Sequence, residues 1–225
     1  MTGMPTPQCR SKIVAVLGRN WHKDLSAAGR QADMIELRLD LVEEVDPIRA
    51  LQAVRESCPA RPIIATARIR SEGGGYAGSE EERIRLLLRA EPYSDYLDIE
   101  LFAPGSGELL SRASSPVIVS YHDFQGMPDQ EEMAEIFSAM KRAGAAIAKI
   151  AVTPESLQDN LRILQFLLAA ETPLCMIAMG ILGRHLRAVA PIYGSALTYG
   201  YITDCTAPGQ MSLQELCLAR ELLKK

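Results

Sequence analysis

Several features that mark other protein classes are missing from this sequence of 225 residues. Its longest apolar runs fall short of the roughly 18 residues that a membrane-spanning helix requires. Residues 1–10 lack the apolar centre of a secretion signal. Lys and Arg total 24 against 28 Asp and Glu, with no basic block. These absences favour a cytoplasmic location, with neither nucleic acid nor membrane as a partner.

Cysteine and histidine are too few and too scattered for a disulfide framework or a metal centre. The five cysteines are odd in number and form no C-x-x-C pair, which indicates free thiols in a reducing compartment. The three histidines are His22, His122 and His185, and no two of them have the spacing of zinc ligands. We therefore expect no metal site.

What the chain does contain is a series of short apolar runs, typical of parallel strands buried on both faces. The expected strands are residues 12–17, 34–40, 62–68, 96–101, 117–122, 146–152, 174–179 and 192–198. Amphipathic helices are expected at residues 46–56, 79–91, 129–143, 154–170 and 212–223, the fourth of them capped by Thr153. Shorter helical segments are expected elsewhere.

This alternation of strands and helices predicts an α/β fold, a (β/α)₈ TIM barrel that forms one catalytic domain over residues 11–225. A doubly wound sheet is the alternative. However, the first strand is followed by Gly18-Arg-Asn-Trp21 rather than by the glycine pattern of a dinucleotide-binding loop. No linker divides the chain, and residues 1–10 are expected to be a disordered lead-in.

Lys149 differs most from its surroundings, because the other residues of 145–152 are all apolar. Burial disfavours the charged form of an amine, and an amine with a lowered pKa is a nucleophile. Lys149 is therefore a candidate for forming an imine with a carbonyl substrate. The structural alternative is a lysine that reaches the surface or pairs with a carboxylate.

Polar residues near the strand ends are the other candidates, because a barrel places its chemistry there. They are Glu36, Arg38, Asp40, Arg68, Glu72, Asp98, Glu100, His122, Arg184, Arg187, Ser195, Thr198 and Gln210. Each could instead belong to a structural ion pair. If these residues lie together at the carboxyl ends of the barrel strands, they provide a histidine suited to proton transfer and arginines suited to binding a carboxylate.

The order and spacing of these residues resemble the type I 3-dehydroquinate dehydratases, the Schiff-base family of the shikimate pathway. The resemblance runs from about Lys12 to the end of the chain. It rests on Glu36-Leu-Arg-Leu-Asp40, Arg68-Ile-Arg-Ser-Glu72, Asp98-Ile-Glu100, Ser120-Tyr-His-Asp-Phe124, Lys149-Ile-Ala151, Gly194-Ser195 and Ala207-Pro-Gly-Gln210.

This resemblance implies the activity of a hydro-lyase. The enzyme would eliminate water from 3-dehydroquinate to give 3-dehydroshikimate through a lysine imine, the third step towards chorismate and the aromatic amino acids. The imine itself would store the electrons, so no cofactor is expected. The family often forms dimers, so a homodimer is a further expectation.

The resemblance also implies roles for single residues. Catalysis would use Lys149 as the imine-forming lysine, His122 as acid and base, and Glu72 as the support of His122. Substrate binding would use Glu36, Arg38, Arg68, Arg187, Thr206 and Gln210. Arg187 is preferred to Arg184 as the carboxylate ligand because it lies seven residues before Gly194. The family often has serine at the position of Thr206.

Two other functions fit a barrel with a strand lysine. A class I aldolase or transaldolase uses the same imine chemistry, but no evident phosphate-binding glycine loop follows the seventh or eighth strand. A non-catalytic barrel that only binds a ligand would be expected to have lost some of Lys149, His122 and Glu72, yet all three are present.

Overall fold

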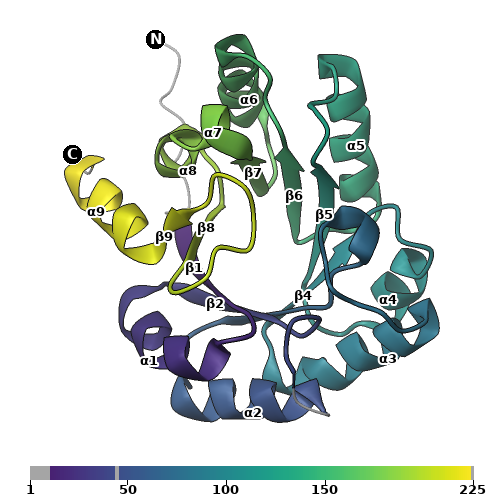
Figure 1. The fold of residues 1–225 in the computed structure, drawn as a ribbon. Helices are drawn as coiled ribbons and strands as arrows, with labels where there is room; N and C mark the ends of the chain where they lie inside the picture. The colour runs from purple at the N-terminus through teal and green to yellow at the C-terminus, as the bar shows by residue number, and fades with distance from the viewer. Residues whose placement is uncertain (1–10, 44–45, 224–225) are drawn as a thin grey trace.

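Parallel strands curl into one sheet in the order β7-β6-β5-β4-β3-β2-β1-β8-β9. The computed structural model describes residues 11–43 and 46–223, and Figure 1 shows helices around the outside of the curled sheet. The strands are β1 Lys12–Leu17, β2 Met34–Arg38, β3 Ile63–Thr66, β4 Tyr96–Glu100, β5 Val117–Asp123, β6 Ile147–Val152, β7 Leu174–Ala178, β8 Leu197–Tyr201 and β9 Met211–Ser212. The expected lead-in, residues 1–10, lies outside the described residues.

Contacts between β7 and β8 join the two ends of the eight-stranded part. The backbone N–H of Ala196 donates to the carbonyl oxygen of Leu174 at 2.8 Å. The N–H of Met176 donates to the hydroxyl of Ser195 at 3.2 Å. The short β9 pairs with β8 outside this ring. The predicted barrel is thus confirmed, with β9 as an unpredicted addition.

The helices lie between the strands as α1 Trp21–Gln31, α2 Pro47–Ser57, α3 Glu80–Ala90, α4 Ser106–Arg112, α5 Gln130–Arg142, α6 Leu157–Ala169, α7 Gly180–Gly183, α8 Leu186–Val189 and α9 Leu213–Leu223. Short 3₁₀ helices are η1 Arg70–Glu72, η2 Glu91–Tyr93 and η3 Ala190–Tyr193. Local signals set their starts: Asp46 caps α2, and Ser79 forms a capping box with Glu82. Across the described part of the chain, every helix is too short or too polar to cross a bilayer.

Two predicted boundaries differ most from the structure. The eighth strand was expected from residue 192, but Ala190–Tyr193 is helical and ends at Gly194, whose φ of 105° is left-handed. Pro191 favours this turn, although the apolar residues around it resemble a strand. Helix α6 is capped by Ser156 and not by Thr153. The Thr153 hydroxyl instead donates to the carbonyl oxygen of Asp123, the last residue of β5, at 3.1 Å.

Alternate side chains of each strand divide between two cores. One core lies between the sheet and the helices and includes Ile35 and Ile63. The other fills the inside of the barrel and includes Met34 and Ile64. Because side chains alternate with a period of two, Met34 on the interior places Glu36 there as well. The strand pattern alone thus turns the polar residues of the strand ends inward.

Candidate active site

One pocket at the carboxyl ends of the strands brings together the nine residues to which the family resemblance assigns a role. Its empty volume is about 520 Å³. The nine are Glu36, Arg38, Arg68, Glu72, His122, Lys149, Arg187, Thr206 and Gln210. Apolar side chains complete the wall, among them Val16, Ile177 and Met179. The pocket therefore lies where a barrel holds its chemistry, with charged groups set against an apolar surface.

Lys149 enters the pocket from β6 and is only 4% exposed. Its Nζ lies 2.9 Å from Oδ2 of Asp98 and 3.6 Å from Oε1 of Glu36. Strands β2 and β4 turn carboxylates towards the same point, so Lys149 is paired with acids although its neighbours along the chain are apolar. These two acids compensate the charge of a buried ammonium. The lysine thus pairs with carboxylates, as the structural alternative expects, and its role in forming an imine stays a prediction.

Asp98 links that lysine to the rest of the site. It is 1% exposed, and its Oδ1 accepts hydrogen bonds from Nη2 of Arg68 and from the hydroxyl of Ser120, both at 2.7 Å. Burial alone would raise the pKa of Asp98, but the neighbouring cations Arg68 and Lys149 hold this pKa well below its usual range. Asp98 is therefore a carboxylate that holds Lys149 in place, a role that the sequence had left open.

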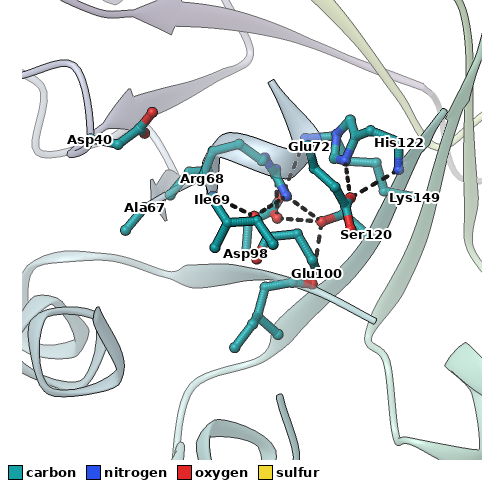
Figure 2. Close-up of polar contacts among 12 residues, drawn as sticks. Asp40, Ala67, Arg68, Ile69, Glu72, Asp98, Glu100, Ser120, His122 and Lys149 are labelled. Carbon is teal, nitrogen blue, oxygen red and sulfur yellow. Dashed lines mark hydrogen bonds and ion pairs between the residues drawn. The ribbon is translucent and has the colours of Figure 1, made fainter. Parts of the chain in front are cut away.

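Arg68 and Glu100 form a buried ion-pair network beneath the pocket, drawn in Figure 2. Nη1 of Arg68 donates to Oε1 of Glu100 at 2.9 Å and to the Ser120 hydroxyl at 2.6 Å. The other oxygen of Glu100 accepts from Nη1 of Arg83 at 2.7 Å. Glu100 is thus bound by two arginines, Arg68 and Arg83, which indicates a structural role. The sequence did not single out Arg83, which is fully buried although it lies in a highly charged helix.

His122 and Glu72 form the second reactive pair of the pocket. Nδ1 of His122 lies 2.9 Å from Oε2 of Glu72, which also accepts the backbone N–H of His122 at 3.0 Å. With Glu72 ionised, Nδ1 carries the proton and Nε2 keeps a lone pair. Burial, reinforced by the cations Arg68 and Lys149, holds the pKa of His122 well below its usual value. His122 is therefore a neutral base at physiological pH.

Glu72 titrates in an unusual range for a carboxyl group. Burial, together with the anions Glu100 and Asp98, raises its pKa to about 7, although Arg68 and the His122 N–H oppose this shift. At pH 7 the group therefore exchanges its proton readily. A carboxyl group that can do so beside a neutral imidazole is suited to acid–base catalysis.

Arg38 is held by Asp40 at the edge of the pocket. Its Nε and Nη2 bind the two oxygens of Asp40 at 2.9 and 2.7 Å. Asp40 also accepts the N–H of Gly75 at 2.9 Å and so fastens the glycine-rich loop that follows β3. Burial would raise the pKa of Asp40, but Arg38 and the N–H of Gly75 lower it. Asp40 therefore positions Arg38 from behind, while Glu36 and Arg38 line the pocket itself.

Arg187 contrasts with these paired arginines. It is buried, its Nη2 donates to the carbonyl oxygen of Pro208 at 3.3 Å, and its Nε has no hydrogen-bond partner among the described residues. Burial lowers its pKa to about 10, so it remains a cation at neutral pH. Arg184 instead binds Glu215 at 2.7 Å. Arg187 is thus a buried cation without an acid partner among the described ion pairs, ready for an anionic ligand.

The loop after β8 covers the pocket and carries Thr206 and Gln210. Figure 1 shows it in yellow between β8 and β9. Oε1 of Gln210 accepts the N–H of Thr206 at 2.8 Å, which braces the turn. The carbonyl oxygen of Pro208 accepts the N–H of Gly180 at 3.1 Å, which ties the loop to the end of β7. In this arrangement the loop closes over the site.

Over residues 11–43 and 46–223, no three His, Cys, Asp or Glu side chains are grouped so that they could hold a metal ion. The nearby thiol of Cys175 is buried, and burial raises its pKa to about 12, so it is not a thiolate at physiological pH.

Comparisons with known proteins show the family to which the chain belongs. The family model for type I 3-dehydroquinase matches residues 17–225. The 3-dehydroquinate dehydratase of Methanothrix thermoacetophila is 52% identical over 94% of this chain and 91% of the relative. That of Methanocella arvoryzae is 41% identical over 91% of this chain and 93% of the relative.

Solved structures give the same result. The 3-dehydroquinate dehydratase of Geobacillus kaustophilus superposes with a TM-score of 0.84 at 29% identity, covering 97% of this chain and 91% of that one. The type I enzyme of Clostridium difficile, described with covalently modified comenic acid, also has a TM-score of 0.84 at 29% identity, with coverages of 95% and 92%. The chain therefore belongs to the type I 3-dehydroquinase family.

Proposed function

We propose that this chain is a 3-dehydroquinate dehydratase, a hydro-lyase that converts 3-dehydroquinate into 3-dehydroshikimate. The observation that carries the proposal is one pocket with three complementary groups. Lys149 supplies a buried amine, His122 and Glu72 form an acid–base pair, and Arg187 is a cation without an acid partner among the described ion pairs. An amine for a ketone, a base for an acidic C–H and a cation for a carboxylate match this substrate.

The first half of the reaction is imine formation. The neutral amine of Lys149 adds to the C3 ketone, and the ketone oxygen leaves as water when the C=N bond forms. Proton shuttling is assigned to His122, whose lowered pKa keeps it neutral near pH 7. Asp98 holds Nζ at a fixed point during this step. The protonated imine then withdraws electrons from C2 and acidifies its C–H bond.

The second half is the elimination. His122 removes the proton from C2, which gives an enamine, and then returns a proton to the C1 hydroxyl as it leaves as water. Glu72 fixes the imidazole through Nδ1, so that Nε2 serves as the reacting atom. Hydrolysis of the product imine releases 3-dehydroshikimate and frees Lys149.

Substrate binding is assigned to the remaining groups. Arg187 binds the carboxylate and thereby orients the ring, which lowers the entropic barrier. The other five, which contact the hydroxyls and the ring, are Glu36, Arg38, Arg68, Thr206 and Gln210. The loop over the pocket excludes water from the imine.

Trapping the imine tests the proposal. The protein is incubated with 3-dehydroquinate, reduced with borohydride and mapped by mass spectrometry, and we expect the adduct on Lys149. The Lys149→Ala variant should show neither adduct nor turnover, whereas Lys12→Ala, at an exposed position of β1, should keep both. Dehydration by the wild type without any adduct would refute the imine route. Turnover of a sugar phosphate in place of 3-dehydroquinate would favour the aldolase alternative.

A homodimer and a cytoplasmic location are part of this proposal. Helix α6 exposes Leu157, Leu161 and Leu168, and Ile181 on the adjacent α7 is also exposed. An apolar surface of this kind favours contact with a second copy of the chain. Light scattering should then give twice the monomer mass, and Leu161→Glu should give the monomer. A monomeric wild type would contradict the dimer without affecting the assigned chemistry.

A further inference from the structure

Tyr199 places its ring beside Lys149 and carries a hydroxyl group without a hydrogen-bond partner among the described residues. It comes from β8, lines the pocket and is 3% exposed. The centre of its ring lies 4.4 Å from Nζ of Lys149. Its hydroxyl is fully buried and has no hydrogen-bond partner among the described residues. A buried polar group in this state is costly, because it has left water without gaining a replacement bond.

Packing does not account for this hydroxyl. The ring belongs to the apolar core inside the barrel, together with Val14, Val16 and Ile177. A phenylalanine would fill the same space without a polar atom, so the ring alone explains the burial but not the oxygen. An unexplained buried polar group beside a reactive centre is more readily explained by a ligand than by the fold.

The hydroxyl is also in the right chemical state to donate a hydrogen bond. Burial, followed by the nearby groups Glu36, Cys175 and Asp98, raises the pKa of Tyr199 well above its usual value. The phenol therefore keeps its proton throughout the physiological range. Nearby carboxylates can accept this proton only by moving, because none lies within hydrogen-bond distance in the described residues.

We infer that the Tyr199 hydroxyl is a further catalytic group, which hydrogen-bonds the substrate oxygen on the carbon attacked by Lys149. This inference rests on the proposed function. When the amine adds to the carbonyl carbon, the π electrons move to that oxygen, which takes up a proton and then leaves as water as the C=N bond forms. A donor beside Nζ stabilises the negative charge that develops on the oxygen. The ring centre lies 4.4 Å from Nζ and the side chain lines the pocket, so Tyr199 and the attacking amine share one wall of the site.

The Tyr199→Phe variant tests this assignment, because it removes only the oxygen. We measure the rate at which 3-dehydroquinate labels Lys149, by quenching with borohydride at successive times and counting the adduct by mass spectrometry. Loss of one hydrogen bond to the reacting oxygen should slow labelling by roughly 5- to 10-fold. Tyr201→Phe on the same strand is the control, since Tyr201 does not line the pocket.

Thermal unfolding of the free protein supplies the second measurement. If the hydroxyl awaits a ligand, Tyr199→Phe should keep or raise the melting temperature, because it removes a buried polar atom without a partner. An unchanged labelling rate in Tyr199→Phe would overturn the inference. So would a slower rate together with a lower melting temperature, because the variant would then have damaged the fold. If the wild type itself forms no adduct on Lys149, the proposed function fails and this inference with it.

Discussion

Nζ of Lys149 and Oδ2 of Asp98 lie 2.9 Å apart inside the barrel, and both side chains are buried. Through its other oxygen Asp98 is bound to Arg68 and Ser120. The position of the Lys149 amine on β6 therefore depends on β4. Asp98 contacts Lys149 directly and so holds its amine in place. The same carboxylate balances the charges of Lys149 and Arg68.

Replacing Asp98 by asparagine keeps the shape of the side chain and removes this charge. Lys149 and Arg68 would lose their shared anion, so we expect kcat to fall by about 10- to 100-fold. Unfolding should become easier by about 3 kcal/mol, since a buried ion pair has lost one partner. Asp95→Asn, which changes an exposed ion pair with Arg55, is the matched control and should leave kcat unchanged. A normal kcat in Asp98→Asn would show that the carboxylate does not position the amine.

The His122→Ala variant should separate imine formation from elimination. Lys149 can still react with the ketone, although more slowly without His122 to shuttle protons, so borohydride should still label it. Turnover should fall by about 10²- to 10⁴-fold with the loss of the general base. His185 is exposed, and His185→Ala should behave like the wild type. An unaffected kcat in His122→Ala would remove this residue from proton transfer.

The raised pKa of Glu72 predicts how kcat/KM falls on the acid side of the pH profile. Its pKa of about 7 means that it becomes protonated as the pH falls through 7 and can no longer accept the proton on Nδ1 of His122. The value of kcat/KM should therefore decline below about pH 7. In Glu72→Gln the value should be low and should lose this dependence. A decline at the same pH in the variant would assign it to another group.

The same shift predicts an effect on stability. A carboxyl group whose pKa is raised by folding contributes stability below the unfolded value near 4.5, and this contribution is lost as the pH rises through 7. Glu72→Gln should therefore gain stability relative to the wild type at pH 8 and differ little at pH 4. Chemical denaturation at both pH values checks the sign.

Arg187 and Arg184 form a natural pair of test and control. Arg187→Ala should raise KM by about 10- to 100-fold, because a charged hydrogen-bond partner of the substrate carboxylate is lost. Arg184→Ala breaks only the ion pair with Glu215 and should leave KM nearly unchanged. The reverse result would make Arg184 the carboxylate ligand. Steady-state kinetics with 3-dehydroquinate decides between them.

Gly209 allows the covering loop to close. Its φ of 67° is left-handed, and a Cβ there would lie 2.1 Å from the carbonyl oxygen of Gly180. Gly209→Ala should hold the loop away from β7, so KM should rise and kcat fall together. Gly107→Ala, where a Cβ would meet nothing within 4 Å, is the control. Unchanged constants in Gly209→Ala would show that closure is not needed.

Much of the fold is predictable because the signals are local. Short apolar runs indicated strands near the observed positions, and Asp46 and Ser79 indicated the helix starts. The eighth strand was misplaced because the residues around Pro191 are as apolar as a strand, while a turn ending at Gly194 decides their conformation. Such errors arise where backbone geometry outweighs composition.

The sequence by itself determined the alternation that turns Glu36, Asp98 and Lys149 inward, since side-chain direction along a strand repeats every two residues. It also supplied the motif spacing through which the family resemblance predicts roles for His122, Glu72 and Arg187. Only the tertiary structure decided which charges meet. Three such findings are that Lys149 binds Asp98, that Arg83 is buried against Glu100, and that Arg187 pairs with no acid among the described residues. All three depend on distances between strands and helices far apart in the chain. Electrostatic pairing acts through space, so no pattern along the chain could reveal it.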